Sequence, residues 1–131
     1  MITHFKQCNA AFLETNYDEQ MLATGKYPYP LKERIRGSKG HLSNNEALQL
    51  FIDHKPPFMS HLILSHLSKN NNRPELVQQL FDEHAGTTKI IIASRYKETA
   101  IHRIADTSPG ITEIGKQLPK KKHLQLSMFE Q

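Results

Sequence analysis

The sequence predicts an α/β fold in which helices pack against a sheet of short strands. Apolar runs of strand length alternate with segments whose apolar residues recur at helical spacing. Along the chain the predicted order is strand, helix, helix, strand, helix, strand, which is typical of a layer of helices on a sheet. The 131 residues are enough for one domain with a core of its own.

The first half of the chain contains one strand and two short helical segments. The apolar run 10–13 predicts a strand that ends in Glu14. The stretch 17–23 is helix-like and is stopped by Gly25. Pro28 and Pro30 mark a loop, after which 31–35 can form a helical turn or two before Gly37.

Two longer helices each carry an apolar stripe, and a buried strand lies next to each. The run 58–65 predicts the strand between the two helices, and 89–93 predicts the strand after the second helix. The stripes are Ala47, Leu48, Phe51 and Ile52 in a helix over 44–53, and Leu76, Val77, Leu80 and Phe81 in a helix over 74–83.

Composition and charge narrow the class of protein. No run of 18 apolar residues and no signal-peptide pattern occurs, so we expect a cytoplasmic protein that does not enter a membrane. The single Cys8 excludes an internal disulfide and a cysteine-rich zinc cluster. The formal charge of +4 and the isoelectric point of about 9.2 permit a polyanionic partner but do not require one.

The last residues of the chain predict a tail rather than part of the domain. We assign residues 1–104 to the domain and expect 105–131 to be a flexible, lysine-rich segment. Its end resembles the short peptide by which bacterial repair and replication proteins hold the DNA sliding clamp. The residues expected to bind that partner are Gln125, Leu126, Met128 and Phe129. The alternative is a tail that folds back so that Phe129 fills a hole in its own domain.

The tripeptide His-Leu-Ser occurs twice, beginning at His41 and at His66. Ser43 and Glu46 have the spacing of a capping box, so His41 lies just outside a helix N-terminus, where an anion such as phosphate is favoured. His66 directly follows the predicted strand 58–65. The carboxyl ends of strands are where open α/β sheets bind ligands, so the two histidines predict a site rather than a core.

Four motifs in order resemble the C-terminal half of a metallo-β-lactamase-fold hydrolase, an αββα sandwich. They are the stretches 14–22, 30–36, 40–44 and 64–71, which read ETNYDEQML, PLKERIR, GHLSN and LSHLSKNN. More narrowly, they resemble the small bacterial members called YycJ or WalJ, which are regarded as DNA exonucleases. The resemblance covers roughly residues 5–96.

The resemblance implies a role for several residues. His66 matches the last metal-binding histidine of the fold, which closes one of two adjacent zinc or manganese sites. His41 matches a histidine beside the scissile phosphate, and Glu14, with Asn16 and Asp18 nearby, matches an acidic motif that supports proton delivery to the leaving oxygen. The implied substrate is DNA, single-stranded or at its ends. The side chains expected to contact it are Ser43, Asn44, Ser68 and Asn71.

The chain departs from the family in one large respect. The family takes most of its metal ligands from an H-x-H-x-D-H motif, and no H-x-H occurs here. We therefore expect a fragment of a longer protein or a truncated reading frame, with no tight metal and no turnover from these residues alone. Two alternatives stay open: a non-catalytic docking module that acts through its tail, and a hydrolase of a small thioester or lactam.

Overall fold

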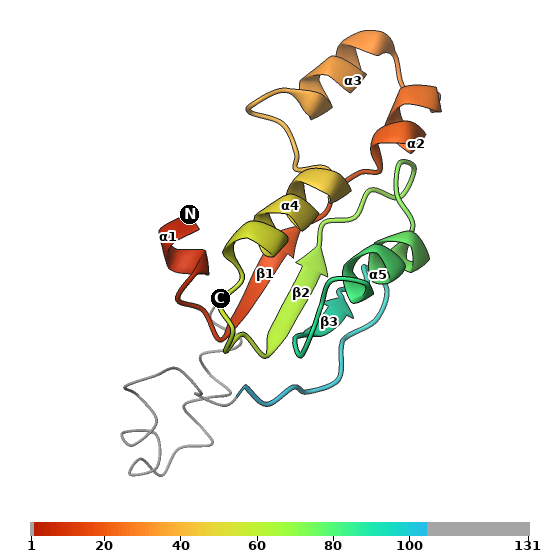
Figure 1. The fold of residues 1–131 in the computed structure, drawn as a ribbon. Helices are drawn as coiled ribbons and strands as arrows, with labels where there is room; N and C mark the ends of the chain where they lie inside the picture. Colours follow the sequence, from red (N-terminus) through yellow and green to blue (C-terminus); the bar gives the residue numbers. More distant parts are fainter. Residues whose placement is uncertain (1, 105–131) are drawn as a thin grey trace, which may run out of the picture.

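The computed structural model describes residues 2–104, which form a three-stranded parallel sheet with five helices (Figure 1). The predicted α/β class is confirmed. The strands are β1 (Ala10–Glu14), β2 (His61–Ser65) and β3 (Lys89–Ile92). The helices are α1 (Ile2–Phe5), α2 (Glu19–Thr24), α3 (Tyr29–Arg36), α4 (Asn44–His54) and α5 (Pro74–Asp82).

The order of the elements differs from the prediction in two places. Three helices, not two, connect β1 to β2, because 31–35 belongs to the eight-residue helix α3. The short helix α1 precedes β1 and was not predicted. It is only four residues long, and its one buried side chain, Phe5, cannot be recognised as a helical stripe.

The three strands lie in the order β1, β2, β3 and all run parallel. Glu14 pairs with Ser65, and Leu64 pairs with Ile92, so the carboxyl ends of the strands share one edge of the sheet. Helices supply the crossovers that parallel strands need. In Figure 1 the helices α2 and α3 extend beyond this edge.

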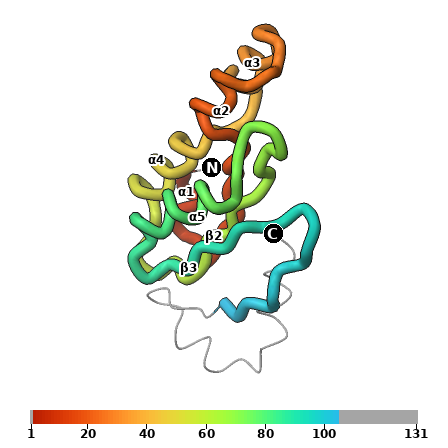
Figure 2. The backbone as a smooth tube through the Cα atoms, turned by 90° about the vertical axis from the view of Figure 1, so that its right-hand side faces the viewer, coloured from red at the N-terminus to blue at the C-terminus, as the bar shows by residue number. Residues whose placement is uncertain are grey.

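The core lies between the sheet and the helices α4 and α5. Figure 2 shows α1, α4 and α5 on one side of the sheet and the segment that follows β3 on the other. The rings of Phe51 in α4 and Phe81 in α5 meet with centroids 5.9 Å apart. Leu62 and Leu64 of β2 are buried in the same cluster. On the opposite face of the sheet Phe12 is 49% exposed.

The apolar stripes are confirmed for most of their residues. Val77 and Phe81 are buried, whereas Leu76, Leu80 and Leu48 are half-buried. Ile52 does not belong to the stripe, since it is 47% exposed. The buried face of α4 is instead centred on Asn44, Ala47 and Phe51.

Two further predictions concern membrane-crossing helices and the C-terminal tail. None of the helices in residues 2–104 is long and apolar enough to cross a membrane. The predicted tail, 105–131, lies outside the described residues, and so does the proposed clamp-binding peptide. Binding of a clamp by Gln125, Leu126, Met128 and Phe129 therefore stays a prediction.

Candidate functional site

The segment that continues β1 lies between the two His-Leu-Ser tripeptides. The backbone N–H of Asn16 donates to the carbonyl of Leu42 at 2.9 Å, in the first tripeptide. The carbonyl of Asn16 accepts from the N–H of Ser68 at 2.7 Å, in the second. The backbone of a single residue thus joins two loops that are 26 positions apart in the chain, counted from Leu42 to Ser68.

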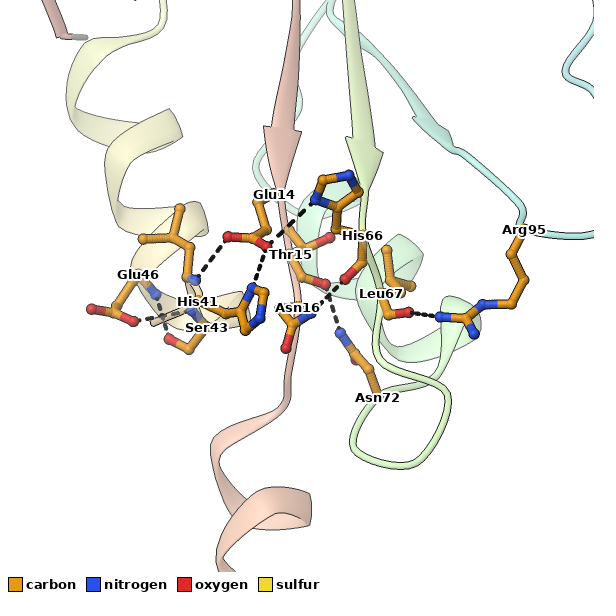
Figure 3. A network of polar contacts seen from close by, with 11 residues as sticks. Glu14, Thr15, Asn16, His41, Ser43, Glu46, His66, Leu67, Asn72 and Arg95 are labelled. Carbon is orange, nitrogen blue, oxygen red and sulfur yellow. Dashed lines mark hydrogen bonds and ion pairs between the residues drawn. The ribbon is translucent and has the colours of Figure 1, made fainter. Parts of the chain in front are cut away.

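Glu14 lies at the centre of the group that this pairing creates (Figure 3). Its Oε2 accepts from Nδ1 of His41 at 2.7 Å and lies 3.6 Å from Nδ1 of His66. Its Oε1 accepts from the backbone N–H of Leu42 at 3.1 Å. One carboxylate at the end of β1 therefore faces both imidazoles, as expected for residues at the carboxyl edge of a parallel sheet.

His41 is placed by the turn that follows α3. Its backbone N–H donates to the carbonyl of Ile35 at 2.9 Å, so the chain folds back on the end of α3. A Cβ at Gly40 would lie 2.3 Å from the carbonyl oxygens of Arg34 and Ile35, so only glycine permits this close approach.

The capping box that the sequence predicts fixes the chain just after His41. Ser43 Oγ accepts from the N–H of Glu46 at 3.1 Å, and Glu46 Oε1 accepts from the N–H of Ser43 at 3.0 Å. This confirms the predicted start of α4. His41 is two residues before the cap, with its side chain half exposed.

His66 follows β2 directly, as predicted, and its backbone adopts the left-handed conformation with a φ of 59°. Among the described residues it is the only non-glycine residue with a positive φ, a conformation that costs free energy for a residue with a Cβ. The Asn16 side chain donates to the carbonyl of His66 at 2.7 Å. Arg95 Nη2 donates to the carbonyl of Leu67 at 2.9 Å. These two side chains hold the turn that points His66 at Glu14.

Sequence reasoning placed Asn16 beside the acidic motif of Glu14 but did not give it this bracing role, and it did not single out Arg95. The Asn16 contact joins residues 50 positions apart, so no local pattern predicts it. Arg95 has no local signal either, since its contact depends on how the chain turns after β3. Both residues support the site through the backbone of the second tripeptide.

Behind the histidines, two asparagines form a buried reciprocal pair. Asn44 Nδ2 donates to Asn72 Oδ1 at 2.9 Å, and Asn72 Nδ2 donates to Asn44 Oδ1 at 2.8 Å. Asn72 Nδ2 also donates to the carbonyl of Thr15 at 2.9 Å. The pair therefore ties the start of α4, the start of α5 and the end of β1 together.

Most of the other predicted site residues are helix caps or buried side chains in the structure. Asp18 is the N-cap of α2, where its Oδ2 accepts from the N–H of Met21 at 2.9 Å. Ser43 is fully buried in the capping box, and Asn44 and Asn71 are each 2% exposed. The side chains of Ser43 and Asn44 are taken up by hydrogen bonds within the loops, which they stabilise. Ser68 is half-buried and lines the cavity beside His66.

Tyr17 lies next to these loops, and its ring is buried. Burial, followed by the charges of Glu46 and Glu19, raises the pKa of its phenol. The hydroxyl therefore keeps its proton near neutral pH, so Tyr17 does not serve as a base there.

A cavity of about 850 Å³ opens beside His41 and His66. Its walls come from α3, from the Gly40–His41 turn and from residues 67–70. Four cations line it, and none of the described lining residues carries a carboxylate. The cations are Arg34, Lys39, Lys69 and Arg95.

The described residues do not make a metal centre by themselves. They contain no group of three or more histidine, cysteine, aspartate or glutamate side chains that could hold a metal ion. Nδ1 of His66 lies 3.6 Å from the Glu14 carboxylate, which is longer than a hydrogen bond. A zinc site takes about four ligands, more than the described residues bring together.

Two curated bacterial proteins named exodeoxyribonuclease are similar to this chain. Exodeoxyribonuclease YycJ of Bacillus anthracis is 38% identical over 82 residues, which are 60% of this chain and 31% of that protein. Exodeoxyribonuclease WalJ of Streptococcus pneumoniae, from the D39 and R6 strains, is 31% identical over 106 residues, which are 78% of this chain and 37% of that protein.

The predicted resemblance to the YycJ and WalJ group is therefore confirmed. The chain spans about a third of the length of the curated relatives that it matches. No family model and no solved structure matches it.

Proposed function

We propose that this chain carries one side of the active site of a phosphodiesterase that degrades DNA. The observation that carries the proposal is the position of the Glu14 carboxylate between the imidazoles of His41 and His66. These groups lie at the carboxyl edge of the sheet and open onto a cavity lined by cations. The names of the YycJ and WalJ relatives support DNA as the substrate.

In this proposal His41 transfers a proton at the leaving oxygen. An ionised carboxylate only accepts hydrogen bonds, so the proton on Nδ1 of His41 faces Glu14. Donation to the leaving oxygen then uses Nε2 and requires the doubly protonated ring, which gives up its Nε2 proton and is left as the Nδ1–H form. Glu14 fixes the tautomer and the direction of the ring, as the acidic member of a catalytic triad does. The Leu42 N–H holds the other oxygen of Glu14 and so limits its rotation.

In this proposal His66 is one metal ligand of the whole protein. The remaining ligands would come from residues other than those described here. The chemistry that a pair of zinc or manganese ions supplies when bound is activation of water and neutralisation of phosphate charge. The contribution of this chain is to hold the imidazole of His66 in one direction through Asn16, Glu14 and Arg95.

We propose further that the fold is the C-terminal half of the metallo-β-lactamase sandwich. The parallel sheet covered by α4 and α5 on one face supports this assignment. On the other face the exposed Phe12 lies where a second sheet would pack.

The test uses this chain together with whatever in-frame sequence precedes Met1 in its gene. Reading that DNA for an in-frame H-x-H-x-D-H shows whether the other ligands are encoded. We expect His41→Ala to keep its metal and to lose roughly a hundredfold or more in the rate of single-stranded DNA cleavage. We expect His66→Ala to lose one metal by elemental analysis, together with nearly all cleavage.

The matched control is His84→Ala, because His84 is an exposed histidine after the far end of α5. It should cleave DNA at the rate of the unaltered protein. Unchanged metal content in His66→Ala would contradict the ligand assignment. Hydrolysis of thioesters or lactams but not of DNA would replace the proposed substrate, and an unaltered rate in His41→Ala would remove its catalytic role.

A further inference from the structure

We infer that the cavity beside His41 and His66 binds one unpaired strand of DNA, with a base stacked on Tyr27 and the phosphates facing the four lining cations. This inference rests on the proposed function for the identity of the polymer. It adds the residues that bind the strand, and it chooses the unpaired form where the sequence resemblance left single strands and DNA ends both open.

The charge of the cavity is the first argument. Arg34, Lys39 and Lys69 lie in its wall, and none of them forms an ion pair within residues 2–104. Arg36, on the same helix as Arg34 but outside the cavity, pairs with Glu33 at 3.1 Å. Uncompensated cations facing one hollow favour a polyanion, because each phosphate that they neutralise releases condensed counterions.

Arg95 adds a positive charge whose side chain is already held in one orientation. Its Nη2 donates to the carbonyl of Leu67 at 2.9 Å, in the turn that carries His66. The guanidinium has further N–H groups that can donate to a phosphate at the same time. A strand bound there would be held within a few residues of the two imidazoles.

Tyr27 supplies the surface for a base. Its side chain is half-buried, and its hydroxyl accepts from the side-chain amide of Asn70 at 3.2 Å. The apolar side chains of Leu31 and Ile35 line the same wall. A tyrosine ring that is tied at its hydroxyl and flanked by apolar groups is a stacking platform of the kind that proteins use for unpaired bases.

The size of the cavity suits a short piece of a single strand. Its volume of about 850 Å³ lies within the range of about 300 to 1,000 Å³ that encloses small ligands. Such a hollow takes one or two nucleotides. Specific duplex binding covers on the order of 1,000 to 2,500 Å² of protein surface, and the bases of a duplex are not free to stack on a side chain.

The experiment measures binding, not cleavage, with the 131-residue chain. A fluorescent oligothymidylate is titrated at salt concentrations between about 50 and 200 mM, and the slope of log affinity against log salt is recorded. Tyr27→Leu should weaken binding about five- to hundredfold at every salt concentration without changing the slope. Lys39→Gln and Lys69→Gln should each reduce the slope by about 0.7.

Each variant has a matched control. Tyr29→Leu makes the same change at an exposed tyrosine of α3 outside the cavity, and Lys6→Gln removes a charge beyond the opposite edge of the sheet. Both should bind like the unaltered chain. Tyr27→Phe keeps the ring and should retain most of the affinity. Circular dichroism of each variant confirms that it is folded. The tail lysines at 120–122 are present in every variant and contribute equally.

Three outcomes would overturn the inference: no binding of the oligothymidylate, equal affinity for a duplex of the same length, or cavity variants that bind like their controls. These outcomes are distinct from failure of the proposed function. If the cavity variants weaken binding but the whole protein does not cleave DNA, only the proposed function fails. If cleavage depends on His41 but Tyr27→Leu binds normally, only this inference fails.

Discussion

Replacing Asn72 by alanine should destabilise the chain more than any exposed substitution near the site. The Asn72 side chain makes four hydrogen bonds, two with Asn44, one with the carbonyl of Thr15 and one with the N–H of Arg73. Asn44 and Thr15 are 2% and 0% exposed, so water cannot replace the lost partner without opening the loops. The substitution therefore leaves buried donors and acceptors without partners.

The expected loss follows from those contacts. An unsatisfied buried polar group costs about 1 to 3 kcal/mol, so Asn72→Ala should lower the free energy of unfolding by about 3 to 5 kcal/mol. Asn44→Ala breaks only the two bonds that it shares with Asn72 and should cost about 2 to 3 kcal/mol. Because these two bonds are already lost in Asn72→Ala, the double variant should lie within about 1 kcal/mol of it.

The assay is urea unfolding followed by circular dichroism, with all three variants compared in one double-mutant cycle. Asn70→Ala is the control, because Asn70 is exposed and makes a single side-chain contact with Tyr27. It should change the stability by less than about 0.5 kcal/mol. Additive losses from Asn72→Ala and Asn44→Ala, or a loss below about 1 kcal/mol for Asn72→Ala, would refute the reasoning.

Three further predictions concern stability. In thermal unfolding, His66→Gly should leave the 131-residue chain as stable as before or about 1 kcal/mol more stable, because glycine adopts a φ of 59° without strain. His66→Val should destabilise the chain, because a β-branched side chain is strained at that φ. Burial, followed by the charges of His102 and Lys89, lowers the pKa of His61 from its ordinary value of 6.5. Just below pH 6.5 the unfolded state therefore binds more protons than the folded state, so the free energy of unfolding should fall as the pH drops through that region. His61→Gln should flatten this decline in urea unfolding curves measured at several pH values. Ser43→Ala should lose about 0.5 to 2 kcal/mol of stability, and an unchanged urea midpoint would show that the capping box contributes nothing.

Local sequence patterns were sufficient for the strands, the longer helices and one helix start. The apolar runs predicted all three strands to within a few residues, because a short buried strand is continuous in sequence. The capping box at Ser43 was predicted because both of its hydrogen bonds join residues three positions apart. The same local reasoning placed His66 directly after a strand.

Burial decided which polar residues are available to a ligand, and burial depends on tertiary packing. Asn44 and Asn71 resemble site residues in sequence, yet the structure encloses both. Ile52 has the spacing of a core residue but lies at the edge of the packed face of α4 and is exposed. Sequence spacing along one helix does not show where the neighbouring elements end.

The meeting of Glu14, His41 and His66 depends on contacts between distant parts of the chain. From the sequence, these three polar residues are expected at or near the ends of strands and helices, and they are separated by 27 and 25 positions. They come together because β1 and β2 pair in parallel, with Glu14 opposite Ser65, and because Asn16 then bonds to both His-Leu-Ser loops. Strand register and loop pairing are long-range interactions, so no local pattern contains them, and only the folded chain determines that one carboxylate serves two imidazoles.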